Sequence, residues 1–265
     1  MRRLLITGAA GAIGSTLRAG LRGVAETMRL TDIRPLGEEQ PGEETVVGDL
    51  HNPAFAQAVT RDVDCLVHLA GVPREDAWEP ILRNNIEAVF HLFEAARLNG
   101  VRRVIFASSN HVTGFYPVEQ EVDPSMPVRP DSRYGVSKVF GEALGRLYSD
   151  KHGLEVACLR IGSFRPRPAS ERQLATWISP RDLTTLVRRC ITAPPFHFLV
   201  LYGVSANTRN RWRDEVRTAI GFEPQDSAED YEDAVPPASS GDPIAERFHG
   251  GDTCAAEFSA KQTSP

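Results

Sequence analysis

The feature that most constrains the fold of this 265-residue chain is a group of three glycines near its start. Gly8, Gly11 and Gly14 follow a short apolar run, Arg3–Thr7, and open a segment, 13–21, in which apolar residues recur at helical spacing. Glycines at these positions permit a tight turn and a close approach of backbone N–H groups to an anion. A strand, a glycine turn and a helix in this order predict the first unit of a dinucleotide-binding sheet.

Segments typical of strands and of helices alternate over the first part of the chain. Further apolar runs typical of buried strands occupy residues 28–31, 45–47, 65–69, 104–108 and 155–160. Helical spacing of apolar residues occupies 13–21, 53–60, 78–99 and 132–152. This alternation predicts parallel βαβ units with helices on both faces. We therefore expect an α/β fold, a Rossmann-type doubly wound parallel sheet with a small C-terminal substrate-binding portion.

The alternation ends after Gly162. Pro166 and Pro168 oppose a regular helix in the segment that follows. Helical spacing returns at 180–192, and 198–202 is predicted to be a seventh strand. The second part of the chain therefore holds much less regular structure than the first.

The tail from Glu223 is rich in Pro, Asp, Glu, Ser and Gly. We expect it to be loop-rich, partly mobile, or used in subunit contacts. We expect two portions in one compact unit. Residues 1–162 would form the dinucleotide-binding domain, and residues 163–265 would form the small substrate-binding portion and tail packed on it.

Composition and charge exclude several classes of protein. The formal net charge is −5, so nothing favours nucleic acid or an anionic membrane surface. No window approaches the roughly 18 apolar residues of a membrane-spanning helix, and the first apolar run is too short for a secretory signal. The four cysteines are too far apart for a CxxC metal or redox site. We expect a cytoplasmic enzyme with no metal, no nucleic-acid partner and no membrane association.

Acidic residues follow the second and third predicted strands. Asp32 lies 18 residues beyond Gly14, close to the spacing at which a carboxylate bonds the ribose hydroxyls of a dinucleotide. A carboxylate there repels a 2′-phosphate and favours NAD, whereas Arg34 can accept that phosphate and keeps NADP open as the alternative. Asp49 and Leu50 are candidates to contact adenine. Small residues at the end of the fourth strand would let the cofactor approach the sheet: Leu69, Ala70 and Gly71.

Tyr134 and Lys138 stand one helical turn apart and share a helix face. A tyrosine with its ordinary pKa of about 10 is a poor base at neutral pH. A nearby ammonium favours the phenolate, so we expect Lys138 to lower the pKa of Tyr134 and also to bond the nicotinamide ribose. Because this pair follows a glycine turn and a series of βα units in the sequence, it predicts an oxidoreductase in which the tyrosine takes the proton.

Polar residues leave the fifth predicted strand at its carboxyl end. Ser108, Ser109, Asn110 and His111 follow one another there, at the edge where open parallel sheets bind ligands. A serine hydroxyl at this edge can bond the reacting oxygen. The structural alternatives are turn capping by the serines and a packed histidine.

These motifs together resemble the extended short-chain dehydrogenase/reductase superfamily, many of whose members are nucleotide-sugar epimerases and dehydratases. The resemblance is strong over residues 3–165. It rests on the three glycines, Asp32 and five further motifs in family order: DL at 49–50, HLAG at 68–71, NNI at 84–86, SS at 108–109 and Y…K at 134–138. The resemblance implies an NAD site formed by Gly8, Gly11, Ala12, Ile13, Gly14, Asp32, Asp49, Leu50, Leu69, Ala70, Gly71, Asn85, Tyr134, Lys138 and Ile161.

Local motifs extend the resemblance to one branch, the uronate dehydrogenases, over nearly the whole chain. They are FASSNH at 106–111, RPD at 129–131, RIGS at 160–163, ATW at 175–177, YGVSAN at 202–207 and RFHGG at 247–251. The branch implies oxidation of D-galacturonate or D-glucuronate at C1 to the aldarolactone, with NAD reduced. It also implies homo-oligomers, because the helices at 78–99 and 132–152 commonly pair in the superfamily.

The resemblance assigns roles at the substrate end of the site. Tyr134, Lys138 and Ser109 would be catalytic, and Arg172 would hold the substrate carboxylate, since a guanidinium matches a carboxylate in bidentate geometry. Arg165 and Arg167 are the alternatives for that carboxylate. The implied substrate contacts are Ser109, Asn110, His111, Tyr134, Ser163 and Arg172.

Two departures from family patterns bear on the substrate. Asn110 stands where epimerases of the superfamily usually carry Ser or Thr, and Pro73 stands where the branch carries a serine that touches the sugar. Only about 100 residues follow the last Rossmann strand, which leaves little chain to enclose a nucleotide diphosphate. The alternatives are an NAD-dependent nucleotide-sugar epimerase or dehydratase, and a non-catalytic NAD sensor, against which the intact Tyr134, Lys138 and Ser109 argue.

Overall fold

Seven parallel strands form the central sheet in the computed structural model, which describes residues 1–236 and 241–260. The strand order is β3-β2-β1-β4-β5-β6-β9, and every neighbouring pair is parallel. The predicted doubly wound α/β fold is confirmed. The strands are β1 (Arg3–Thr7), β2 (Thr27–Asp32), β3 (Glu43–Val47), β4 (Cys65–His68), β5 (Arg103–Ser109), β6 (Glu155–Ile161) and β9 (Phe198–Gly203).

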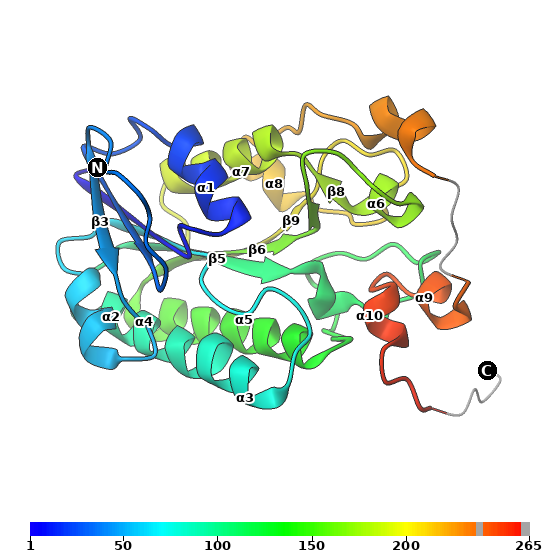
Figure 1. Cartoon of the computed structure of the whole chain (residues 1–265), viewed down its shortest axis with the longest axis horizontal. Helices are drawn as coiled ribbons and strands as arrows, with labels where there is room; N and C mark the ends of the chain where they lie inside the picture. Colours follow the sequence, from blue (N-terminus) through cyan, green and yellow to red (C-terminus); the bar gives the residue numbers. More distant parts are fainter. Residues whose placement is uncertain (237–240, 261–265) are drawn as a thin grey trace.

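Helices cover both faces of the sheet, as Figure 1 shows. On one face lie α1 (Ala12–Gly20), α7 (Pro180–Thr192) and α8 (Val216–Ala219). On the other face lie α2 (Pro53–Val59), α3 (Trp78–Ile81), α4 (Ala88–Leu98) and α5 (Arg133–His152). Successive strand residues point to opposite faces, so Leu4 and Ile6 belong to the first core and Leu5 to the second.

The helical segment expected over residues 78–99 contains one departure from α-helical geometry. Between α3 and α4 the chain forms a π-helical segment, η1 (Leu82–Glu87). Such segments add a residue to a turn and often occur at functional sites. This one carries Asn84, which lines the central cavity, and Asn85, which is buried beside the loop that follows β4.

Helix α5 begins and ends where its sequence predicts. The Ser132 hydroxyl accepts a hydrogen bond from the Gly135 N–H at 2.9 Å and caps the first turn. Gly153 adopts a left-handed conformation, with φ of 73°, and ends the helix. The cap places Tyr134 in the first turn and Lys138 one turn later, so both side chains face the carboxyl edge of the sheet.

The C-terminal part of the chain is built from short elements. A two-stranded sheet pairs β7 (Ser163–Phe164) with β8 (Trp177–Ile178). The other short helices of this part are α6 (Glu171–Thr176), η3 (Ala228–Ala234), α9 (Pro243–Arg247) and α10 (Asp252–Ala255), and one more, η2 (Asn110–Thr113), follows β5. These helices are too short for a hydrophobic period to predict.

The tail lies against the segment that follows β5. Phe248 forms an antiparallel bridge with Pro117, and the His249 N–H donates to the Tyr116 carbonyl at 2.9 Å. The described part of the tail is loop-rich, as expected, and residues 237–240 and 261–265 lie outside the described ranges. Within the described ranges, no helix has the length and apolarity needed to span a membrane, and no cluster of His, Cys, Asp and Glu side chains is arranged to hold a metal.

Candidate active site

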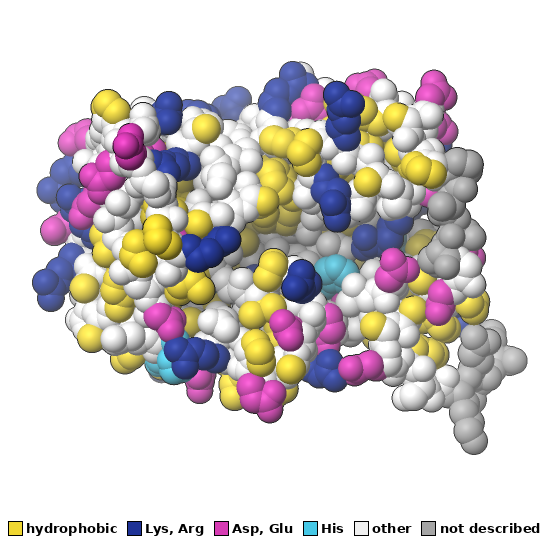
Figure 2. Space-filling model, in the orientation of Figure 1, with side chains coloured by type: hydrophobic (Ala, Val, Ile, Leu, Met, Phe, Trp, Pro, Cys, Tyr) yellow, Lys and Arg dark blue, Asp and Glu magenta, His cyan; other side chains and the backbone are white. Residues whose placement is uncertain are grey.

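A cavity of about 910 Å³ runs along the carboxyl edge of the sheet. It is centred on β1 and β4, where the chain order reverses and open α/β sheets bind ligands. Figure 2 shows it as a hollow with Lys and Arg side chains gathered around its rim. The loops after six strands contribute to its wall, so residues that are far apart in the sequence meet there.

The glycine turn forms one end of the cavity and leaves no room for side chains. Gly8 has φ of 69°, and a Cβ there would lie 2.6 Å from the Ala70 nitrogen. A Cβ on Gly14 would collide with the Gly8 carbonyl oxygen. Gly11 precedes α1, whose first turn has no side-chain cap. The turn therefore offers helix N–H groups and the positive end of a helix dipole to an anion such as a pyrophosphate.

Asp32 lies beside the glycine turn at the end of β2. Its Oδ2 accepts from the Ala10 N–H and its Oδ1 from the Arg34 N–H, both at 3.0 Å. The Arg34 Nε also donates to Oδ1, at 3.4 Å, so one of the roughly four lone-pair positions of the carboxylate is left for a ribose hydroxyl, and a second becomes free if the Arg34 side chain moves. The Arg34 side chain is 62% exposed, with its Nε 3.4 Å from Asp32 Oδ1. The carboxylate and the glycine turn together fit the ribose and pyrophosphate of a dinucleotide.

Asp49 lies farther along the same end of the cavity. The His51 N–H and the Arg83 guanidinium donate to its two oxygens, at 2.9 and 2.7 Å. Burial raises the pKa of Asp49, but these hydrogen bonds outweigh burial and hold the pKa below its ordinary value. Asp49 is therefore an anionic acceptor beside Leu50, which also lines the cavity.

Asn85 does not line the cavity and instead fixes the loop that follows β4. Its Oδ1 accepts from the Val72 N–H at 2.8 Å, and its Nδ2 donates to the Val72 carbonyl at 3.0 Å and to Ser137 Oγ at 3.0 Å. Gly71 packs closely against Asn85. A Cβ at position 71 would lie 2.7 Å from Asn85 Oδ1, so only glycine fits there. In this structure Asn85 therefore positions the loop, and its direct contact with the cofactor stays a prediction.

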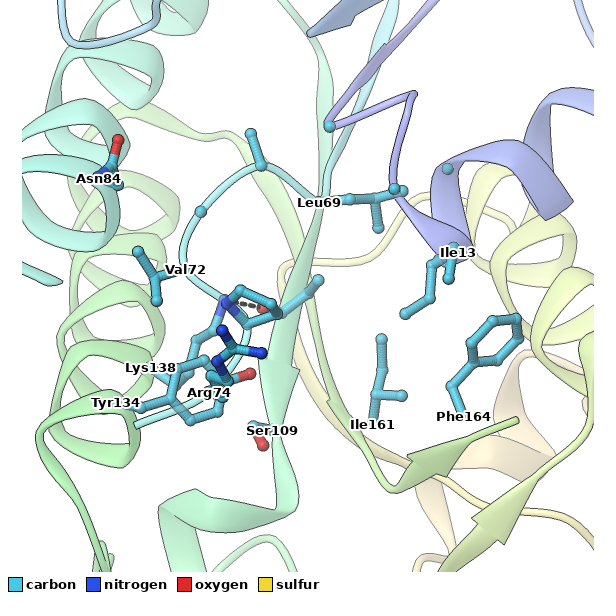
Figure 3. A pocket seen from close by; sticks show the side chains of 18 of the residues that line it. Ile13, Leu69, Val72, Arg74, Asn84, Ser109, Tyr134, Lys138, Ile161 and Phe164 are labelled. Carbon is cyan, nitrogen blue, oxygen red and sulfur yellow. Dashed lines mark hydrogen bonds between the residues drawn. The ribbon is translucent and has the colours of Figure 1, made fainter. Parts of the chain in front are cut away.

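Tyr134 and Lys138 point from α5 into the cavity, facing an apolar wall of Ile13, Ile161 and Phe164 (Figure 3). The Lys138 ammonium donates to the Ala107 carbonyl at 2.8 Å and lies 5.4 Å from the Tyr134 ring centroid. Two of its N–H groups are left for a ligand such as ribose.

The expected depression of the Tyr134 pKa is absent from this structure. Burial raises the pKa of Tyr134 to about 12, and a hydrogen bond with Ser109 offsets only part of that rise. Burial also lowers the pKa of Lys138 to about 8. The sequence argument weighed the ammonium but not burial, which disfavours the charged form of both groups.

His111 stands beside Tyr134, with ring centroids 5.9 Å apart. Its Nδ1 is 2.7 Å from Oδ2 of Asp131, whose side chain is completely buried. Asp131 also accepts from the Ser132 hydroxyl at 2.7 Å. If Nδ1 carries the proton that Asp131 accepts, the Nε2 of His111 is an acceptor for a substrate hydroxyl.

Asn110 and Arg172 meet at the far end of the cavity. The Arg172 Nε and Nη2 donate to the His249 carbonyl at 3.0 and 2.7 Å. In the amide orientation that satisfies both neighbours, Asn110 donates to the Ile161 carbonyl at 3.1 Å and accepts from Arg172 Nη2 at 3.2 Å. Burial lowers the pKa of Arg172, and the charge of Asp131 opposes that change.

Comparisons with known proteins agree with this geometry. A family model described as the NAD dependent epimerase/dehydratase family matches residues 4–180. The uronate dehydrogenase of Pseudomonas putida is 42% identical over 252 residues, which is 94% of this chain and 94% of that one. The chain belongs to the uronate dehydrogenases of this family. The resemblance seen in the sequence motifs is thereby confirmed.

Two solved structures of uronate-oxidising enzymes have the same fold. A tyrosine-to-alanine variant of uronate dehydrogenase from Agrobacterium tumefaciens, complexed with NAD, has a TM-score of 0.92 and 41% identity over 96% of this chain and 97% of that chain. The glucuronic acid dehydrogenase from Chromohalobacter salexigens has a TM-score of 0.92 and 42% identity, with the same coverage.

All but one of the residues that the resemblance assigned to the cofactor or substrate line the same cavity. They are Gly8, Gly11, Ala12, Ile13, Gly14, Asp32, Asp49, Leu50, Leu69, Ala70, Gly71, Ser109, Asn110, His111, Tyr134, Lys138, Ile161, Ser163 and Arg172. Asn85 is the exception. Of the alternative arginines, Arg165 lines the cavity, whereas Arg167 stacks on Tyr231 outside it.

Sequence reasoning missed several residues of the site. Asp131 belongs to the RPD motif, but its contact with His111 joins segments that no local pattern connects. Glu75 accepts from the Tyr134 N–H at 2.9 Å and from Arg133 at 2.5 Å, and thereby ties the loop after β4 to α5. Only a three-dimensional structure reveals such contacts.

Proposed function

We propose that this protein oxidises D-galacturonate or D-glucuronate at C1 to the aldarolactone, with NAD as the hydride acceptor and Tyr134 as the base. The observation that carries the proposal is that one cavity contains both a set of residues suited to oxidation and a set suited to binding a sugar acid. Tyr134, Lys138 and Ser109 supply the oxidoreductase groups, and Asn110 and Arg172 supply a cationic, hydrogen-bonding end suited to a sugar acid. Membership in the uronate dehydrogenases supports the same reaction.

The N-terminal half of the cavity holds the dinucleotide. The glycine turn receives the pyrophosphate, Asp32 the adenosine ribose, and Lys138 the nicotinamide ribose. Bound NAD supplies the hydride acceptor and a positive charge beside the phenol. The apolar wall of Ile13, Ile161 and Phe164 keeps water from the reacting face.

Tyr134 takes the proton of the C1 hydroxyl while that carbon gives up hydride. Ser109, which is hydrogen-bonded to Tyr134, also bonds the reacting oxygen and keeps the phenol and the hydroxyl in register. Because burial raises the pKa of Tyr134 to about 12, a free phenolate is scarce at neutral pH. Only the phenolate can take the substrate proton, and the positive charges of the Lys138 ammonium and of bound NAD beside the phenol would favour its formation before hydride is lost.

The substrate end orients the sugar. His111, held by Asp131, accepts a hydrogen bond from a ring hydroxyl, and Asn110 bonds another polar group of the ring. The Arg172 Nη1 group, which has no protein partner among the described residues, meets the substrate carboxylate. Ser163 lies on the same wall, where its hydroxyl bonds Thr176 at 2.9 Å.

The deciding experiment is NADH formation. Purified protein with NAD and galacturonate or glucuronate should raise the absorbance of NADH, and Tyr134→Phe should not. An NAD-dependent epimerase or dehydratase would instead retain its cofactor tightly, turn over a nucleotide sugar and give no net NADH. That pattern, with no turnover of any hexuronate, would contradict the proposal.

Assembly and location are further parts of the proposal. Several large apolar side chains are exposed on α3, α4 and α5: Trp78, Phe90, Leu98, Val136 and Leu147. A homo-oligomer formed through these helices would cover them, and light scattering of the purified protein tests it. The four cysteines are buried and unpaired, which suits the cytoplasm.

A further inference from the structure

Arg74 is a cation in the cavity wall that the roles assigned above do not use. It belongs to the segment 69–74, LAGVPR, which follows β4 and lines the cavity. Arg74 carries the only polar side chain of that segment. Any directional bond from a side chain of this wall to a polyhydroxylated, anionic substrate must therefore come from Arg74.

The Arg74 guanidinium is exposed and has no hydrogen-bond or ion-pair partner within residues 1–236 and 241–260. Figure 3 shows it extending from the loop into the cavity, on the side of Tyr134 and Ser109. The neighbouring Arg133 differs, because it is paired with Glu75 and Glu257. Arg74 is thus free to bind a ligand in a way that Arg133 is not.

The backbone on both sides of Arg74 is fixed. Two residues before it, Val72 is held through both its N–H and its carbonyl by the buried Asn85. One residue after it, Glu75 accepts from the Tyr134 N–H. The position of Arg74 relative to Tyr134 is therefore set by the same contacts that hold the loop on α5, and only its side chain needs to move to reach a ligand.

Arg172, which lines the same cavity from α6, cannot satisfy a carboxylate alone. Its Nε and Nη2 already donate to the His249 carbonyl, and Nη2 also bonds Asn110. Only Nη1 is left, so the bidentate fork that an arginine normally offers to a carboxylate is mostly occupied. A substrate carboxylate bound by Nη1 alone would keep unsatisfied acceptor positions, and these can bind a second cation.

Positive charge exceeds negative charge in the cavity lining although the chain as a whole is acidic. Arg34, Arg74, Lys138, Arg165 and Arg172 line the cavity, against the carboxylates of Asp32, Asp49 and Asp76. The whole chain has a formal net charge of −5. Like charges gathered in a cleft focus the field there and raise the local concentration of an oppositely charged substrate.

We propose that Arg74 is a specificity-determining residue that binds the anionic sugar from the loop after β4, as a second cation beside Arg172. This inference rests on the proposed oxidation of hexuronates. Arg74 acts through charge on the substrate carboxylate, and it takes no part in the transfer of the proton or the hydride. The segment thereby selects sugar acids over neutral sugars of the same ring size.

The test compares Arg74→Ala and Arg74→Lys with the wild type in NADH formation from galacturonate. Arg61→Ala is the matched control, since Arg61 is exposed, lies before β4 at the other edge of the sheet and does not line the cavity. Arg74→Ala should raise the KM for galacturonate about tenfold, with kcat within about twofold of the wild type. Arg74→Lys should recover part of the loss, and Arg61→Ala should match the wild type.

Salt provides a second readout that a merely structural role would not change. Added sodium chloride should lower kcat/KM of the wild type for galacturonate and lower that of Arg74→Ala less. An unchanged KM in Arg74→Ala, or an unchanged salt response, overturns the role of Arg74. If the wild type binds NAD but oxidises no hexuronate, the proposed function fails first and this inference with it.

Discussion

Replacing Lys138 by methionine should stabilise the protein while it abolishes turnover. Lys138 is 7% exposed, and its one hydrogen-bond partner among the described residues is the Ala107 carbonyl at 2.8 Å. Burial lowers its pKa from 10.5 to about 8, because the ammonium is poorly solvated there. Methionine fills a similar volume without a charge, so the folded protein no longer has to bury the ammonium.

The pKa shift sets the size of this effect and its pH dependence. One pKa unit corresponds to about 1.36 kcal/mol, so the fall to about 8 destabilises the wild type by about 3 kcal/mol at about pH 7. The unfolded chain binds this proton more tightly than the folded chain. Stability of the wild type therefore rises as pH increases from about 8 towards 10.5, and the destabilisation falls to about 1 kcal/mol at about pH 9.5.

Methionine also loses the hydrogen bond to the Ala107 carbonyl, which lowers the gain in free energy of unfolding by about 1 kcal/mol. Lys138→Met should therefore be more stable than the wild type by about 2 kcal/mol at about pH 7 and nearly equal to it at about pH 9.5. Urea unfolding of the cofactor-free protein measures this difference in free energy of unfolding. Lys151→Met, at the exposed end of the same helix, is the matched control and should change stability by less than about 0.5 kcal/mol.

NADH formation from galacturonate should be lost in Lys138→Met and kept in Lys151→Met. Two results would refute the reasoning about burial. One is a Lys138→Met protein that is less stable than the wild type at neutral pH. The other is a gain in stability that does not shrink as the pH is raised.

Three further substitutions test the roles of single side chains. Tyr134→Phe should lower turnover by orders of magnitude with little change in NAD affinity, as steady-state rates and an NAD titration would show. Arg172→Ala should raise the KM for galacturonate at least about tenfold; an equal loss for a neutral sugar would remove Arg172 from its role as carboxylate partner. Asp131→Asn should raise the KM for galacturonate several-fold, because His111 loses its charged partner, and it should leave NAD affinity unchanged; weaker NAD binding would contradict this assignment.

The set of residues that line the proposed dinucleotide half of the cavity could be predicted almost completely from the sequence. Its residues lie in short segments at the ends of predicted strands, where a parallel sheet brings them together whatever the details of packing. Gly8 and Gly14 are examples, since the backbone contacts that exclude a Cβ follow directly from the strand, turn and helix. Asp32 is another, because β2 lies beside β1 in the sheet.

Contacts between side chains of distant segments could not be predicted from the sequence, because they depend on how those segments pack. The bonds by which Asn85, in the π-helical segment, holds Val72 of the loop after β4 are an example. The pKa of Tyr134 was expected to fall next to Lys138, but burial of the phenol raises it. Neither the extra residue in a helical turn nor the burial of a single side chain has a signature in the local sequence.

The C-terminal tail completes the substrate end of the cavity and has no described contact with the dinucleotide end. The His249 carbonyl holds the Arg172 guanidinium. Gly250 leaves room for the Asp131 carboxylate, which a Cβ at that position would displace. Because Asp131 in turn holds His111, the backbone of two tail residues sets both the guanidinium and the imidazole that we propose to face the sugar. The sheet therefore forms the proposed cofactor site, and the proposed recognition of the substrate depends on the packing of the tail against the segments that follow β5 and β6.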